Sequence, residues 1–181
     1  MLEKIRQFIK KEAEPNDWKY HIVPVVYYAK KLAKTLKVNE EVAELAALLH
    51  DIGRLKFGPK DHDITGVPEA ERILIKHGYP QGVIDEIKHC VESHRGSKDI
   101  RPKTITAKIV ANADAMAHFD VLPLFFYSFS KKGSFEEVFH WVDQKIERDW
   151  KKKLTLPEAK KMMAEKYQAI KSILDSNRKY L

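Results

Sequence analysis

The chain has little cysteine, little glycine and no long hydrophobic run. Its one cysteine, Cys90, excludes an internal disulfide and a cysteine-based zinc cluster, so we expect a reducing, cytoplasmic environment. Only 7 of the 181 residues are glycine. No apolar stretch approaches the roughly 20 residues of a membrane span, and the charged start MLEKIRQFIKKEAE is unlike a signal peptide. These absences predict a protein that neither enters a membrane nor carries a targeting segment.

The chain is basic, but its basic residues are spread out. Its 33 Lys and Arg against 26 Asp and Glu give a formal net charge of +7, and much of the lysine is interleaved with glutamate, as on solvated helix faces. Such an excess can attract anionic small molecules, but it is too diffuse to indicate nucleic acid. We therefore expect a small phosphorylated substrate and no nucleic-acid partner.

The spacing of apolar residues predicts an all-α protein. Alternation with a period of two is nearly absent, whereas apolar residues recur three and four positions apart from end to end. Helices are expected over about 2–13, around His21, and over 40–50, 68–77, 80–94 and 104–119, with two more that begin near Ser134 and Thr155. Asn39 is the expected N-cap of the helix at 40–50, Gly53 its terminator, and Pro68 and Pro80 the first residues of later helices. We expect a single domain over 1–181, with a compact core at about 18–120 and a C-terminal helical extension at about 121–181.

Several polar side chains fall on the apolar faces of these expected helices. They are His21, the pair His50 and Asp51, His94, and Asp114. Each alone would more often be a satisfied core histidine or a capping aspartate. Together they are the imidazoles and carboxylates that a divalent transition metal binds when thiolates are absent. Asp114 also lacks a basic partner at helical spacing, so its burial requires a cation from elsewhere.

These residues carry a resemblance to a known family. His21, the sequence HDIG at 50–53 and the distant Asp114 resemble the H…HD…D signature of the HD-domain superfamily of metal-dependent phosphohydrolases. The resemblance covers about residues 18–120. It implies an all-α core that binds a divalent metal, which could be Mn, Fe, Co, Ni, Zn or Mg, through His21, His50, Asp51 and Asp114.

His62 and His94 raise the question of a second metal. Some members of the superfamily bind two metals through an H…HD…H…H…D pattern, and these two histidines occupy the intervening positions. His62 lies in the polar stretch GPKDHD, where a loop is expected, so it could instead be solvated or contact a substrate phosphate. His94 lies on an apolar helix face and is as consistent with a metal ligand as with a phosphate contact. One metal and two metals therefore both stay open.

The resemblance implies hydrolysis of a phosphate ester. A bound divalent ion lowers the pKa of water and so supplies hydroxide at neutral pH for attack on phosphorus. The candidate catalytic residues are Asp51, which would orient the attack, His94 and Arg54. The candidate substrate-binding residues are Arg54, His62 and Arg95, because arginine can bind phosphate oxygens bidentately.

Three further features are interpreted more simply. His118 lies four residues after Asp114, close enough on a helix to be a ligand or a ligand's partner. The last position of the H…HD…D signature nevertheless favours Asp114 as the ligand. The run DWKKKL at 149–154 is expected to be a solvated charged end. Phe125, Phe126 and Phe129 could close the core or an interface between copies of the chain, so a homo-oligomer is open.

The leading hypothesis is a metal-dependent phosphohydrolase that cleaves a phosphomonoester or phosphodiester of a nucleotide or a related small molecule. One alternative is a metal- or nucleotide-binding regulatory module with little turnover. The other is a di-iron oxygenase, since some HD-type folds carry that chemistry. Turnover of a phosphate ester distinguishes the first from the second, and oxygen consumption with a requirement for iron identifies the third.

Overall fold

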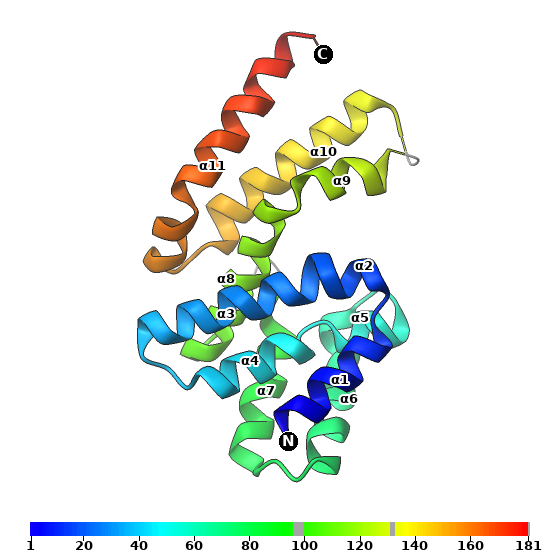
Figure 1. Ribbon diagram of the computed structural model, residues 1–181, viewed down its shortest axis with the longest axis vertical. Coiled ribbons are helices and arrows are strands. Elements are labelled where there is room, and N and C mark those ends of the chain that lie inside the picture. The colour runs from blue at the N-terminus through cyan, green and yellow to red at the C-terminus, as the bar shows by residue number, and fades with distance from the viewer. Residues whose placement is uncertain (96–99, 131–132, 181) are drawn as a thin grey trace.

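The computed structural model describes residues 1–95, 100–130 and 133–180, and these residues form helices and turns without a β-strand (Figure 1). The predicted all-α class is confirmed. In chain order the elements are α1 (Leu2–Glu12), α2 (Pro15–Asp17), the π-helix η1 (Trp18–Ile22), α3 (Val23–Leu36), α4 (Glu40–Leu49), α5 (Ile52–Phe57), α6 (His62–Lys76), α7 (Gln81–Ser93), α8 (Ile105–Asp120), α9 (Leu122–Phe129), α10 (Phe135–Arg148), the π-helix η2 (Asp149–Lys153), α11 (Pro157–Asn177) and the 3₁₀-helix η3 (Arg178–Tyr180).

Helix α8 lies at the centre of the core. Helices α3, α4 and α7 pack against it, α6 packs between α5 and α7, and α1 lies against α4. Most side chains of α8 are fully buried, which explains why its sequence is rich in alanine and carries few charges. Helices α9, α10 and α11 lie together at one end of the molecule, and α11 returns to contact α8 and α3 (Figure 1).

Helix α4 brings the pair at residues 50 and 51 into the core. The Asn39 side chain accepts hydrogen bonds from the backbone N–H groups of Glu41 and Val42 at 3.0 and 3.2 Å, as the N-cap prediction requires. Every residue from 43 to 49 is buried, and the helix ends at Leu49. The next two residues, at the inner end of the helix, are His50 and Asp51.

His21 lies in the π-helical turn η1. The backbone N–H of Val23 bonds to the carbonyl of Trp18 five residues earlier, so one extra residue is inserted before α3 begins. Pro24 then falls in the first turn of α3, where a missing N–H costs little. The chain therefore passes from His21 into α3 without a break.

The predicted start of α6 at Pro68 is wrong. The helix begins at His62, and Pro68 lies inside it on the exposed side. Proline removes the hydrogen bond to the carbonyl of Ile64, but Ile64 is 52% exposed, so solvent can satisfy that carbonyl. This earlier start moves His62 out of the expected loop and onto the first turn of a helix.

The predicted role of Gly53 as a helix terminator is also wrong. Gly53 lies in α5, where it meets Gly66 of α6 at a close backbone crossing. A Cβ atom on Gly53 would lie 2.1 Å from the carbonyl oxygen of His62 and 2.6 Å from the amide nitrogen of Gly66. The absence of a side chain at this position allows α5 and α6 to approach, which brings His62 close to Asp51.

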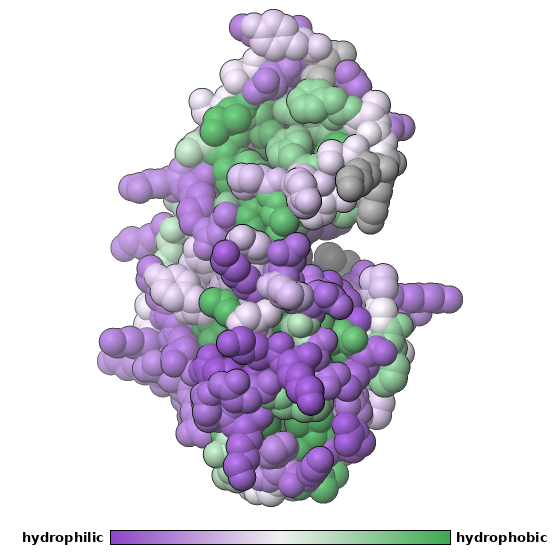
Figure 2. All heavy atoms as spheres, turned by 45° about the vertical axis from the view of Figure 1, so that its right-hand side comes forward, coloured by the Kyte–Doolittle hydropathy of each residue, from purple (hydrophilic) through white to green (hydrophobic). Residues whose placement is uncertain are grey.

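Hydrophobic side chains reach the surface on the end of the molecule built by α9 to α11 (Figure 2). Tyr127 and Phe135 are 71% and 59% exposed, whereas Phe125, Phe126 and Phe129 are half-buried and pack against the core. Among the described residues, no single helix is long and apolar enough to cross a membrane. Helices α8 and α9 meet that test only as a pair, and they are bent by 74°.

Substitution of Gly53 by alanine tests the α5–α6 crossing. Because the new Cβ would meet backbone atoms that cannot move independently, we expect Gly53→Ala to lower the free energy of unfolding by about 3 kcal/mol. Gly82→Ala is the matched control, since a Cβ there meets nothing within 4 Å and alanine favours a helix. Urea unfolding measures the free energy of unfolding of both variants. Equal values would contradict a close backbone contact at Gly53.

Candidate metal centre

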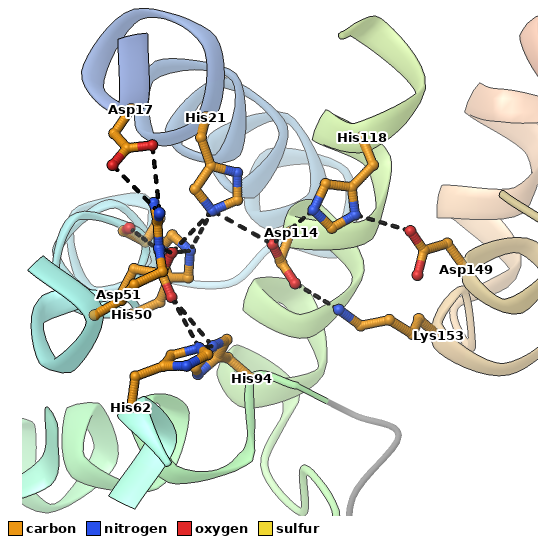
Figure 3. Close-up of polar contacts among 12 residues, drawn as sticks. Asp17, His21, His50, Asp51, His62, His94, Asp114, His118, Asp149 and Lys153 are labelled. Atoms are coloured by element: carbon orange, nitrogen blue, oxygen red, sulfur yellow. Dashed lines mark hydrogen bonds and ion pairs between the residues drawn. The ribbon is translucent and has the colours of Figure 1, made fainter. Parts of the chain in front are cut away.

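Six side chains from separate parts of the chain lie together at the floor of a pocket (Figure 3). They are His21 from η1, His50 and Asp51 from the end of α4, His62 from α6, His94 from the end of α7, and Asp114 from α8. His21, His50, Asp51 and Asp114 are the residues that the resemblance implied as ligands, and for His62 and His94 the sequence left a metal ligand or a phosphate contact open. The structure brings them together, including His62, which was expected in a loop.

A first group forms around His21. Its Nε2 atom lies 3.1 Å from Nε2 of His50 and 3.1 Å from Oδ2 of Asp51. Oδ1 of Asp114 is 3.6 Å from the same nitrogen. One ligand atom each from His21, His50 and Asp51 falls within the spacing that a single metal ion allows.

A second group forms on the other oxygen of Asp51. Oδ1 lies 3.2 Å from Nε2 of His62 and 3.4 Å from Nε2 of His94, and these two nitrogens are 3.2 Å apart. These three side chains also meet the spacing for one ion. The two groups share Asp51 and use different oxygens of its carboxylate.

The orientations of three imidazoles are set by their other ring nitrogens. Nδ1 of His50, His62 and His94 each lies 2.6–2.9 Å from the backbone carbonyl oxygen three residues earlier. A carbonyl can only accept, so each Nδ1 carries the proton and each Nε2 presents a lone pair to the site. Metal-binding histidines are commonly held in this way.

This donor set suits a divalent metal. Lone pairs on His62 and His94 that face each other at 3.2 Å repel unless a proton or a cation lies near them. The carboxylate nearest to this histidine pair is that of Asp51. It is 5% exposed and is shared among four imidazoles. Imidazole and carboxylate together are the ligands of first-row transition metals. The residues that are present could therefore hold such an ion at either group.

Burial and charge shape the titration of these groups. Burial lowers the pKa of His50 to about 3, against the opposing effect of Asp51. Burial alone would raise the pKa of Asp51, but the surrounding histidines hold it well below its usual range. Burial would likewise raise the pKa of Asp114, and Lys153 and His118 hold it well below. In the metal-free protein the site therefore contains ionised carboxylates and a neutral His50.

The two predicted arginines lie at the rim of the site. Nε of Arg54 is 2.7 Å from Oδ2 of Asp51, and its NH1 lies 3.2 Å from Asp17. NH1 of Arg95 lies 3.2 Å from Asp63. Both guanidinium groups line the pocket, so each can approach a phosphate there. The ion pair of Arg54 with Asp51 was not expected, and it orients the carboxylate of a candidate ligand.

Three residues of the site were missed, namely Lys145, Asp149 and Lys153, whereas His118 had been considered as a ligand or a ligand's partner. The prediction that residues 149–154 are a solvated end is wrong, because Asp149 is 0% and Lys153 is 7% exposed. Oδ2 of Asp149 lies 2.8 Å from Nδ1 of His118. The signal was present in the spacing: residues 142, 146, 149 and 153 form one stripe that begins with buried Val142 and Ile146.

Asp114 was predicted to lack a basic partner at helical spacing and to need a cation from elsewhere, and Lys153 is a cation of that kind. Its Nζ atom lies 2.5 Å from Oδ2 of Asp114. The partner is 39 residues away in the chain, beyond the reach of any argument from helical spacing. The C-terminal extension thus supplies a cation to the carboxylate of α8.

A pocket of about 460 Å³ opens above these groups. One side is polar and carries the histidines and the two arginines. The other side is formed by the extension, and it is lined by Val121, Leu124, Phe125 and Phe129 with Lys145 and Arg148. The ring of Phe125 lies 5.5 Å from that of His118 and 5.7 Å from that of Trp141. The pocket therefore joins a charged floor to an aromatic wall.

Comparison with known sequences gives one family. The family model described as HD domain matches residues 18–118. Ribonuclease Y from Symbiobacterium thermophilum is 36% identical over 97 residues, which are 54% of this chain and 17% of that protein. A tRNA (cytidine(56)-2'-O)-methyltransferase from Picrophilus torridus is 33% identical over 114 residues, covering 55% of this chain and 31% of that protein. The chain thus spans less than a third of the length of either relative.

Comparison with solved structures shows the fold over nearly the whole chain. Bacillus subtilis YpgQ superposes with a TM-score of 0.77 at 19% identity, over 99% of this chain and 95% of that one. The same protein in complex with ADP gives a TM-score of 0.76 at 18% identity, over 99% and 94%. A predicted HD superfamily hydrolase from an uncultured Thermotogales bacterium gives 0.68 at 22% identity, over 97% and 90%. The likeness includes the helices of the extension.

The buried histidines predict an acid-sensitive metal-free protein. Burial lowers the pKa values of His50 and His118 to about 3 and 4. Between pH 6.5 and 4 the unfolded chain therefore binds protons that the folded chain does not, and unfolding becomes easier as pH falls. Each group contributes up to about 1.4 kcal/mol per pH unit.

Urea unfolding in EDTA at several pH values measures this slope. His50→Gln should make it shallower, whereas His140→Gln, at an exposed histidine outside the site, should leave it unchanged. A free energy of unfolding that is constant from pH 6.5 to 4.5 would contradict the prediction.

Proposed function

The chain belongs to the HD domain family, and from this premise we propose that it is a metal-dependent phosphohydrolase that cleaves a phosphomonoester or phosphodiester of a nucleotide or related small molecule. The resemblance predicted from the HD signature is thereby confirmed, and the structural neighbour described as an HD superfamily hydrolase supports the reaction class. The reaction, the substrate class and the dependence on a divalent metal are our proposal.

One observation carries the proposal. The carboxylate of Asp51 lies between two pairs of imidazoles, with one oxygen toward each pair, at the floor of a pocket lined by Arg54 and Arg95. Such a donor set binds divalent metal, and the nearby guanidinium groups provide the positive charge that a phosphate ester requires. The alternative of a purely structural histidine cluster does not explain why it opens into a pocket with cationic sides.

We assign a role to each residue of the site. A bound divalent ion would supply hydroxide near neutral pH and withdraw charge from the phosphate. His21, His50, Asp51 and Asp114 are proposed to hold it, and His62 and His94 with Asp51 are proposed to hold a second ion. Asp51 would orient the attacking oxygen, since one of its carboxylate oxygens faces each group of imidazoles. Arg54 and Arg95 would bind nonbridging phosphate oxygens.

The shape of the pocket supports an organic phosphate with a planar group. Phosphate would lie over the charged floor, and the aromatic wall around Phe125 would face the rest of the molecule. A nucleotide has both parts. YpgQ, which shares this fold, was solved in complex with ADP, and this supports a nucleotide as a ligand to test with this chain.

RNA is the second candidate substrate. Two relatives named Ribonuclease Y are 36% identical to this chain over 97 and 99 residues. A phosphodiester within RNA is chemically compatible with the same metal and arginine residues. The net charge of +7 is spread over the chain and does not favour this candidate over a nucleotide, so both belong in the substrate screen.

Substitution of Asp51 tests hydrolysis directly. Metal-loaded wild-type protein should contain a divalent metal by elemental analysis and should release phosphate or nucleoside monophosphate from a panel of nucleotides, phosphate esters and a short single-stranded RNA. Asp51→Ala should lower kcat by on the order of 10³ or more, because both proposed metal positions lose a ligand.

Asp85→Ala is the control, as it removes an exposed carboxylate outside the site. Ligand retention without turnover would favour a regulatory module. Oxygen consumption that requires iron would favour an oxygenase. Wild-type activity in Asp51→Ala would reject the proposed mechanism.

Substitution of Phe125 tests the aromatic wall. Phe125→Ala should raise KM for a nucleotide about tenfold, because a stacked ring contributes on the order of 1 kcal/mol or more to binding. KM for a small phosphate ester without a ring should change little. Tyr127→Ala, on the same helix and 71% exposed, is the matched control. Equal effects of Phe125→Ala on both substrates would contradict a role in binding the planar group.

A further inference from the structure

Lys153 is the one buried lysine among the described residues, and it lies against a proposed metal ligand. Its Nζ atom is 2.5 Å from Oδ2 of Asp114, and the two side chains are 7% and 8% exposed. Figure 3 shows the lysine reaching Asp114 from the side opposite to His21. A charged pair removed from water in this way makes a strong and geometrically defined contact.

The contact divides the two oxygens of Asp114 between different partners. Oδ2 faces the ammonium group, whereas Oδ1 lies 3.6 Å from Nε2 of His21 and 3.6 Å from Nε2 of His118. With Oδ2 occupied, Asp114 has one oxygen available for a metal at the His21 group. Lys153 therefore sets the orientation of this carboxylate, and the ion pair as a whole carries no net charge.

The segment that carries Lys153 is firmly attached to α8. The side chain of Asn112 accepts hydrogen bonds from the backbone N–H groups of Thr155 and Leu156 at 2.9 and 3.0 Å. Asp149, fully buried, bonds Nδ1 of His118 at 2.8 Å and Nζ of Lys145 at 2.5 Å. These contacts lie on both sides of Lys153 in the sequence, so its position does not depend on the ion pair alone.

We propose that Lys153 is an internal counter-cation for Asp114. It is a positioning residue that holds Asp114 with one oxygen toward the metal, and its positive charge repels the metal ion. This inference rests on the metal centre of the proposed function. It assigns the C-terminal extension, which lies beyond the residues matched by the family model, a direct effect on metal affinity.

The proposal has two linked consequences. In the metal-free protein Lys153 compensates Asp114, so the fold does not have to bury an unpaired carboxylate. In the metal-loaded protein the ammonium group and the metal share that carboxylate and repel each other, so Lys153 weakens metal binding. A neutral residue at 153 should reverse both effects, making the metal-free protein less stable and the metal more tightly bound.

Lys153→Met, Lys153→Arg and Lys152→Met test the proposal in the full chain. Lys152 is exposed and adjacent, and so provides the matched control. Calorimetric titration with Mn²⁺ should show the dissociation constant of Lys153→Met falling by about tenfold, while Lys153→Arg and Lys152→Met stay close to wild type. Melting temperatures in EDTA and in saturating Mn²⁺ should show that the metal raises the melting temperature of Lys153→Met more than that of wild type.

A purely structural lysine gives a different result. The melting temperature of Lys153→Met would then fall below that of wild type by the same amount with and without Mn²⁺. Its dissociation constant for Mn²⁺ would differ from that of wild type by less than about twofold. These results would overturn the proposal. If Lys153→Met unfolds in EDTA, recovery of the fold in Mn²⁺ supports the proposal and failure to recover overturns it. Wild-type protein that binds Mn²⁺ without hydrolysing any ester rejects the proposed hydrolase and leaves this inference intact. Wild-type protein that binds no Mn²⁺ overturns both.

Discussion

The site depends on the carboxylate of Asp51. One oxygen lies 3.1 Å from His21, the other lies 3.2 Å from His62 and 3.4 Å from His94, and Arg54 binds at 2.7 Å. A buried carboxylate is costly unless it is compensated, so each of these partners must be held in position by the fold. Helix α4 delivers Asp51, the glycine crossing of α5 and α6 brings His62 to it, and α7 ends at His94.

The C-terminal extension is part of the same electrostatic arrangement. Asp114 faces the histidines with one oxygen and Lys153 with the other, and His118 is bound by Asp149. The extension also forms the aromatic wall of the pocket through α9. Its two contributions are therefore distinct: buried charge next to the proposed ligands, and apolar surface where the organic part of a substrate would lie.

The errors of sequence reasoning have physical causes. Pro68 was expected to start a helix, but proline is tolerated inside α6 because the carbonyl it leaves unpaired belongs to an exposed turn. Gly53 was expected to end a helix, but it is needed where two backbones touch. The charges of residues 149–154 were expected in solvent, since a run of lysines is usually solvated, and the partner that buries Lys153 is 39 residues away.

The sequence by itself determined the helical class and the cap of α4 at Asn39, because helical periodicity and capping are local properties. The cost of burying polar groups singled out five of the histidines and aspartates, whereas His62 became a candidate only through the resemblance to the HD-domain superfamily. Only the tertiary structure decided which of these side chains meet. It placed His62 beside His94, divided the oxygens of Asp51 between two groups, and brought Lys153 to Asp114. Such contacts depend on how helices that are far apart in the chain pack against one another. The spacing of residues along a single helix carries no information about that packing.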